Sequence, residues 1–266
     1  MKRVLTKQFG LIIIESLSSE YKKTGRSLHQ ELRNKTFVEP CLSLKIFEVN
    51  NKNELSQLFV NITNELRSLT FFPIIHIDAH GSIDGLTLAS DELVYWDELF
   101  NMTRELNVLM LNSLVLVLAL CDGISIISRI NPEKRAPFKV IIGCEKRIGE
   151  NDLLKAFELF YDNFFFSFNV FESVDKMNSL WENKPIFHSL TSDYCFDNIS
   201  DIERDSKHFE RLINQIAIME KSTNPQFSKI EFAKVKEYVK NKLIKMSDEL
   251  KSKRDYFLIN DLKNNS

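Results

Sequence analysis

The stretch PIIHIDAHG, residues 73–81, decides the fold, because a run of β-favouring apolar residues ends abruptly in His-Gly. A second stretch, LVLVLALCDG at residues 114–123, has the same build and ends in a cysteine. Nearly continuous apolar strands are typical of parallel sheets that are buried on both faces. Because the carboxyl ends of parallel strands meet at one edge of a sheet, we expect the histidine and the cysteine to come together.

Similar apolar runs alternate with helical patterns along most of the chain. The runs predict strands at 9–17, 41–49, 73–81, 114–121 and 138–144, with another strand within 185–196. The helical patterns lie at 20–35, 54–69, 96–111, 150–165 and 170–182, and a small hairpin is expected within 84–99. Asn53 is expected to cap the second helix. The alternation predicts an α/β fold: a mostly parallel sheet flanked by helices on both faces.

Composition narrows the class of protein. The 266 residues are 44% hydrophobic and 27% charged, enough for one large domain with an appendage. A net charge of −2 gives no reason to expect nucleic acid, and no apolar run is long enough to span a membrane. The apolar run at 9–14 is too short for a secretion signal and is followed by Glu15, so we expect a cytoplasmic protein.

The cysteines do not predict a metal site. The four of them lie far apart and form no CxxC pair: Cys41, Cys121, Cys144 and Cys195. Without paired ligands a zinc site is not expected, and in a reducing compartment neither are disulfides. We therefore predict no metal and no cofactor.

The composition shifts near residue 199. Two helical segments follow, at about 201–221 and 227–261, and the second carries an apolar row on a lysine-rich helix. We therefore expect a main domain at 1–198 and a C-terminal helical extension at 199–266. The row could pack against the main domain or dock a partner. Its members are Phe232, Val235, Val239, Leu243, Met246 and Leu250.

The two strand ends carry groups that suit nucleophilic catalysis. A cysteine nucleophile needs a base to form the thiolate, and donors to hold the oxyanion that forms on the attacked carbonyl. His80 can be the base, and Cys121 can be the nucleophile. Gly81 has no side chain to obstruct a carbonyl that approaches its N–H, and Cys121 adds its own backbone N–H. The sequence therefore predicts a cysteine–histidine site with an oxyanion hole at Gly81 and Cys121.

Alternatives remain for the residues around this pair. Cys144 also ends an apolar strand and is the rival nucleophile, although Glu145 would disfavour a thiolate beside it. Asp78 lies between His76 and His80 on one strand face, so it could orient His80 or be a buried carboxylate bonded to loop N–H groups. His76 is interpreted as a core histidine. Two further aspartates flank the expected crevice and could meet a cationic substrate side chain, or simply form turns: Asp84 and Asp122.

The ordered set of motifs resembles a known family. In order along the chain come an apolar strand then HG, the hairpin DGLTLASDELVYWDEL, a helix, a strand ending in cysteine, and FKVIIGCEKRI before a helix. This set of motifs is similar to that of the caspase-like cysteine peptidases, most closely the CHAT-domain family. The resemblance covers roughly residues 9–198. It implies a caspase-like fold with His80 as general base, Cys121 as nucleophile, and Gly81 and Cys121 as oxyanion donors. The position two before the nucleophile often lines the substrate pocket in relatives and is often polar or acidic, whereas here it is Ala119.

The resemblance also implies a function. It predicts a thiol protease, a hydrolase that cleaves a protein partner, in a bacterial defence or cell-suicide system of the antiviral kind. The substrate could be a pore-forming or other effector protein encoded nearby, and a partner or signal could activate the enzyme. The alternative is a caspase-fold scaffold without proteolysis that docks a partner through its C-terminal helices. Neither nucleic acid nor a membrane is an expected partner.

Overall fold

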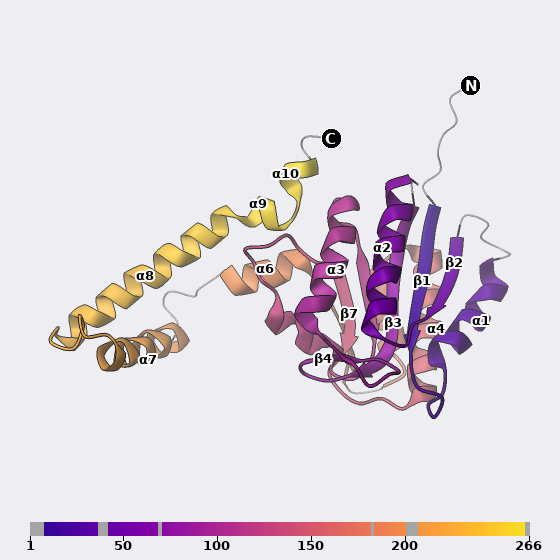
Figure 1. The fold of residues 1–266 in the computed structure, drawn as a ribbon, viewed down its shortest axis with the longest axis horizontal. Coiled ribbons are helices and arrows are strands. Elements are labelled where there is room, and N and C mark those ends of the chain that lie inside the picture. Colours follow the sequence, from indigo (N-terminus) through magenta and orange to yellow (C-terminus); the bar gives the residue numbers. More distant parts are fainter. Residues whose placement is uncertain (1–7, 37–41, 69–70, 182–183, 201–206, 264–266) are drawn as a thin grey trace, which may run out of the picture.

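A computed structural model of the chain describes residues 8–36, 42–68, 71–181, 184–200 and 207–263. It contains an eight-stranded mixed sheet, mostly parallel, with the order β2-β1-β3-β6-β7-β8 and a β4–β5 hairpin that pairs with β3 (Figure 1). Helices cover both faces, and further helices follow at the C-terminal end. The predicted α/β class, the mostly parallel sheet and the helical extension are therefore confirmed.

The strands follow the predicted apolar runs closely. The register is parallel between β1 and β2 and between β1 and β3. The strands are β1 (Gln8–Ser16), β2 (Leu42–Glu48), β3 (Phe71–Gly81), β4 (Gly85–Thr87), β5 (Leu93–Tyr95), β6 (Val115–Ala119), β7 (Val140–Cys144) and β8 (Phe187–Thr191).

The helices form two layers, one on each face of the sheet, and a separate group at the C-terminal end. They are α1 (Thr24–Thr36), α2 (Lys52–Ser68), α3 (Trp96–Leu109), α4 (Glu150–Ser167), α5 (Val170–Asn178), α6 (Ser192–Ser200), α7 (Lys207–Thr223), α8 (Phe232–Ser252), α9 (Arg254–Phe257) and α10 (Asn260–Lys263), with a 3₁₀ helix, η1, at Gly123–Arg129. None of these helices is long and apolar enough to cross a membrane, within the part of the chain that the structure describes.

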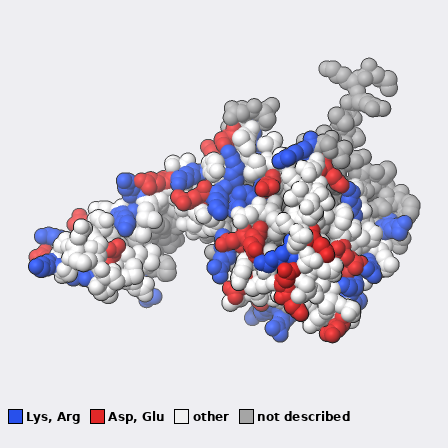
Figure 2. Space-filling view, in the orientation of Figure 1, with Lys and Arg blue, Asp and Glu red and all other residues white. Residues whose placement is uncertain are grey.

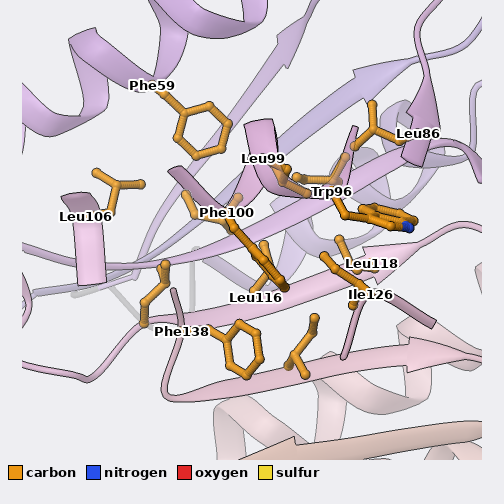
Figure 3. Close-up of a cluster of buried hydrophobic side chains, with 14 of the residues drawn as sticks. Phe59, Leu86, Trp96, Leu99, Phe100, Leu106, Leu116, Leu118, Ile126 and Phe138 are labelled. Carbon is orange, nitrogen blue, oxygen red and sulfur yellow. The ribbon is translucent and has the colours of Figure 1, made fainter. Parts of the chain in front are cut away.

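One face of the sheet packs against α2, α3 and α6. Alternate residues of β1, such as Ile12 and Ile14, point into this layer, as expected for a strand of period two. The predicted apolar stripe of α2 supplies Leu55, Phe59 and their neighbours, and α3 supplies Trp96 and other large side chains. Figure 3 shows these side chains meeting residues of β6 and the segment before β7.

The opposite face packs against α1, α4 and α5. It takes the other residues of β1, Leu11 and Ile13, and a group of aromatic side chains from α4. His76 of β3 is buried here, and its Nδ1 lies 2.9 Å from the Tyr161 hydroxyl. Burial lowers the pKa of His76 to about 3, so the ring is neutral at pH 7. The interpretation of His76 as a core histidine is confirmed.

Several details differ from the prediction. The strand within 185–196 is shorter, because β8 ends at Thr191 and α6 follows, and β8 runs antiparallel to β7. The predicted cap at Asn53 is wrong: α2 begins at Lys52, and the Asn51 side chain accepts a hydrogen bond from the Glu54 N–H at 3.0 Å. Strand β6, which corresponds to the predicted strand at 114–121, ends at Ala119. Cys121 therefore lies in the turn after β6 rather than at the end of the strand.

The C-terminal segment has two parts. Helices α7 and α8 form a hairpin that extends away from the sheet (Figure 1), with its own small core around Phe209, Ile213 and Val239. The chain then returns to the main domain, where Phe257 and Leu258 enter the core layer of α2, α3 and α6. The apolar row of α8 is thus divided: Val235 and Val239 pack against α7, and Leu250 packs against the main core, whereas Met246 is exposed.

Candidate functional site

The sheet order makes neighbours of the strands that carry His80 and Cys121. Strands β3 and β6 pair in parallel, and the last pair in their register joins Asp78 to Ala119. His80 and Cys121 each follow this pair by two residues. Because the register is parallel and both offsets are equal, the two residues come together at the same edge of the sheet.

The glycine after His80 has a steric reason to be there. A Cβ placed on Gly81 would lie 2.0 Å from the carbonyl oxygen of Cys121 and 2.5 Å from a methyl carbon of Leu120. No side chain fits in such a gap. The HG motif therefore lets the backbone after His80 lie directly against the backbone of Cys121.

A pocket of about 180 Å³ opens at this edge of the sheet, on the face that carries α1 and α4. It is lined by both candidate groups, His80 and Cys121, and by residues of the loop after β1 and of α1, β3, β6, β7 and α4. The other lining residues are Leu17, Tyr21, Lys22, Thr24, Asp78, Ala79, Ala119, Leu120, Cys144, Ile148, Glu150 and Leu153. Apolar atoms form most of the wall, and Asp78, Thr24 and Glu150 supply oxygens.

His80, which lines this pocket, has a ring nitrogen without a hydrogen-bond partner among the described residues. That atom, Nε2, is buried. The ring is held by an edge-on contact with Tyr21, whose ring centroid lies 4.2 Å away. A buried polar atom without a partner is costly in a folded protein, so its presence at a cavity calls for an explanation in function.

The two cysteines at the pocket differ in environment. Cys121 is partly exposed, whereas Cys144 is 1% exposed. The Cys144 thiol lies 3.0 Å from the Leu120 carbonyl oxygen, to which it donates a hydrogen bond. Burial, and secondarily the neighbouring Cys121 sulfur, raise the pKa of Cys144 to about 11. Since the thiolate is the reactive form, Cys144 is poorly suited to act as a nucleophile at neutral pH.

Asp78 contacts the start of α1. Its carboxylate accepts a hydrogen bond from the Thr24 hydroxyl at 2.5 Å and another from the Gly25 N–H. Glu15, opposite Asp78 in the β1–β3 register, accepts from the Arg26 N–H at 2.9 Å. Burial raises the pKa of Asp78 to about 7, and the nearby Glu15 carboxylate adds to the rise. Of the two readings of Asp78, this geometry matches the buried carboxylate that binds backbone N–H groups.

The other candidate residues fall into two groups. Ala119 lines the pocket, two residues before Cys121. Asp84 and Asp122 are not among the lining residues: Asp84 lies 3.5 Å from Arg129 at the surface, and Asp122 has the left-handed backbone conformation, with φ of 56°, at the start of η1. The turn interpretation therefore suits both aspartates better than a direct substrate contact.

Sequence reasoning missed the contribution of the loop after β1. Tyr21 positions the His80 ring, and Thr24 and Glu15 anchor the start of α1 beside the pocket. A signal was present in Glu15, a lone acid at the end of an apolar strand, because such a residue is rarely buried without partners. In the described ranges of the chain, no three His, Cys, Asp or Glu side chains are grouped as metal ligands would be.

Comparison of the sequence with protein-family models and with curated proteins found no match.

Proposed function

We propose that the protein is a cysteine endopeptidase of the caspase-like type, with Cys121 as nucleophile and His80 as general base. One observation carries the proposal: the buried Nε2 atom of His80 has no partner among the described residues, and His80 lines the same pocket as the partly exposed Cys121. A thiol and an unsatisfied imidazole at the same edge of the sheet are the two parts that thiol-protease chemistry needs.

The reaction proceeds in two stages. His80 takes the proton of the Cys121 thiol, and the sulfur attacks the peptide carbonyl carbon; the oxyanion is held by the N–H groups of Gly81 and Cys121. The C–N bond then breaks, and His80 gives its proton to the departing amine. A water molecule, deprotonated by His80, hydrolyses the thioester and releases the carboxylate product and the free thiol.

The pocket lining favours certain types of substrate side chain immediately before the cleaved bond. Its walls, formed by residues such as Leu17 and Leu153, suit an apolar stem, while the exposed Glu150 carboxylate suits a cationic end. Lys22 also reaches the pocket, but its ammonium donates to Asn151 at 2.7 Å. We therefore expect lysine, arginine or leucine to be accepted before the cleaved bond, and aspartate to be rejected.

Covalent labelling tests the proposal directly. Peptidyl acyloxymethyl ketones with lysine or leucine before the reactive group should modify Cys121, and a probe with aspartate there should react far more slowly. His80→Ala should slow the labelling by about two to four orders of magnitude, the usual worth of a positioned base. Peptide mass mapping identifies the modified cysteine, and circular dichroism confirms that each variant is folded.

Cys144→Ala is the matched control, since it removes the other thiol of the pocket. It should label at the wild-type rate, whereas Cys121→Ala should not label. Modification of Cys144 in the wild type, or equal labelling of His80→Ala and wild type, would remove the basis for the proposal. The natural substrate, for which we propose a protein effector encoded nearby, and any activating partner are then sought by cleavage assays with the wild type and Cys121→Ala.

A second candidate function rests on the α7–α8 hairpin. It extends away from the sheet and exposes several large apolar side chains, among them Ile218, Met219 and Met246. Such a surface suits a scaffold that docks a partner without cleaving it. A folded wild-type protein that fails to react with every probe, but binds a partner that the hairpin-deficient Val239→Asp variant does not bind, would favour this second function.

A further inference from the structure

A second, larger cavity lies away from the His80–Cys121 pocket, between the main domain and the returning C-terminal segment. Its volume is about 650 Å³, against 180 Å³ for the pocket at Cys121. Its walls come from α2, α3, the loop before β7, and α9. The lining residues are Thr63, Arg67, Asn101, Arg104, Glu105, Val108, Leu109, Lys134, Arg135 and Tyr256.

Four of the lining side chains are cations, and two of them are held in place. Arg104 donates from Nε to the Arg135 carbonyl oxygen at 2.6 Å and from Nη1 to Asn101 at 2.8 Å. The Arg135 guanidinium makes a bidentate pair with Asp261, at 2.6 Å for each bond, and lies 4.2 Å from the centroid of the Tyr256 ring. Both guanidinium groups are therefore positioned before any ligand arrives.

The other two cations have no carboxylate to neutralise them. Arg67 and Lys134 form no ion pair with any residue that the structure describes. The four cations face three carboxylates, which leaves one positive charge: Glu105 in the lining, Asp261 paired with Arg135, and Asp97 near Arg104. Burial lowers the pKa of Arg104, although the nearby Asp97 carboxylate opposes this. A partly desolvated guanidinium with donors to spare is stabilised by an anion.

The chemistry of the cavity selects one class of anion. The planar guanidinium group of arginine matches phosphate oxygens in geometry as well as in charge. A cavity of several hundred cubic ångströms suits a molecule of nucleotide size. The Tyr256 ring, 44% exposed at the wall, offers an aromatic surface beside the cations. In Figure 2, basic side chains gather between α3 and the C-terminal helices on this face of the molecule.

We propose that this cavity binds a phosphorylated small molecule of nucleotide size, held by Arg67, Arg104 and Lys134. Binding would join α2 and α3 to the segment that carries Tyr256, so the ligand would fix the C-terminal segment against the main domain. The site is separate from the Cys121 pocket, and the proposal does not depend on proteolysis.

Thermal unfolding and calorimetry of the full chain test the proposal with four probes: inorganic phosphate, pyrophosphate, AMP and ATP. At a hundredfold excess over Kd, a nucleotide should raise the Tm by roughly 5 °C. Arg104→Gln should weaken nucleotide binding by about tenfold or more, as expected for the loss of a charge-assisted bond. Because Arg104 also supports the loop at Arg135, the exposed Arg67→Gln and Lys134→Gln variants are measured as well, and each should weaken binding.

Arg211→Gln, an equal change of charge on the exposed face of α7, is the control and should bind as the wild type does. Three results would overturn the proposal. The first is the absence of binding by every probe at millimolar concentration. The second is equal affinity in the wild type and in all three cavity variants. The third is nucleotide binding no tighter than that of inorganic phosphate, which would reduce the cavity to a general anion site.

Discussion

Gly81 lies directly against the backbone of Cys121, and its replacement gives a prediction that does not depend on catalysis. A methyl group at this position would meet the Cys121 carbonyl oxygen at 2.0 Å, so one of the two backbone segments must move. We expect Gly81→Ala to destabilise the fold by about 1–3 kcal/mol, the usual cost of overpacking, and to abolish labelling of Cys121. Urea unfolding measures the first effect and the covalent probes measure the second.

Gly149→Ala is a suitable comparison, since the nearest contact of a Cβ there is an ordinary 3.9 Å. This variant should be within about 0.5 kcal/mol of the wild type. If Gly81→Ala proved as stable as Gly149→Ala, the close approach of the two strand ends would be wrong.

The buried carboxyl of Asp78 predicts a pH dependence of stability. Its pKa is raised from 3.8 to about 7, so the folded state holds the proton more tightly than the unfolded state does. The protonated Asp78 carboxyl therefore stabilises the folded state fully below pH 3.8, and this stabilisation is lost as the pH rises through 7. The shift of about three units corresponds to roughly 4 kcal/mol.

Asp78→Asn keeps an oxygen for Thr24 and Gly25 but has no proton to lose. Between pH 4.5 and 7.5 its free energy of unfolding should therefore fall less than that of the wild type, by about 3 kcal/mol. The added amide N–H can also donate to Glu15, whose Oε2 is buried without a partner among the described residues. Parallel pH curves for the two proteins, obtained by urea unfolding, would contradict the raised pKa.

At the scale of elements, the sequence predicted what depends on local pattern. The apolar runs and the stripe of α2 predicted the strands and the helices, because the period and the burial pattern of these elements appear in consecutive residues. That β3 and β6 are neighbours was only assumed, and the structure supplies it. The direction of β8 was not predicted, since five residues with mixed burial fit either direction. The contacts of Tyr21 and Thr24 join β1, α1 and β3 through tertiary packing, which no local pattern encodes.

The α7–α8 hairpin should behave as an element with its own stability. Its core around Val235 and Val239 is separate from the two cores of the sheet. Val239→Asp buries a charge there and should cost several kcal/mol, enough to open the hairpin. Hydrogen exchange should then show loss of protection in α7 and in the first turns of α8, while β1, β3 and β6 keep theirs.

Val60→Asp is the matched control, because Val60 is 46% exposed on α2 and the chemical change is the same. It should leave exchange unchanged throughout the chain. Loss of protection across the main sheet in Val239→Asp would mean that the hairpin and the main domain unfold as one unit.

For the whole molecule, the expected boundary near residue 198 separates the sheet from a helical extension in sequence, but the fold joins them again. Ala136 donates its N–H to the Phe257 carbonyl oxygen at 2.8 Å, and the Phe257 ring lies 5.0 Å from the ring of Phe196. Ion pairs between Arg254 and Asp197 and between Arg135 and Asp261 also hold this C-terminal segment against the main domain. The last helices therefore complete the main domain, although the hairpin before them stands apart.

A protein ending at residue 198 should accordingly be unstable, since it lacks the side chains that fill the layer of α2, α3 and α6. Phe257→Ala tests this within the full chain: Phe257 is fully buried, so the variant should lose about 3–5 kcal/mol in the free energy of unfolding. Phe171→Ala removes a phenylalanine that is 50% exposed on α5 and should lose far less. Equal stability of the two variants in urea would show that the C-terminal segment rests on the surface, and the cavity beside Tyr256 would then lose one of its walls.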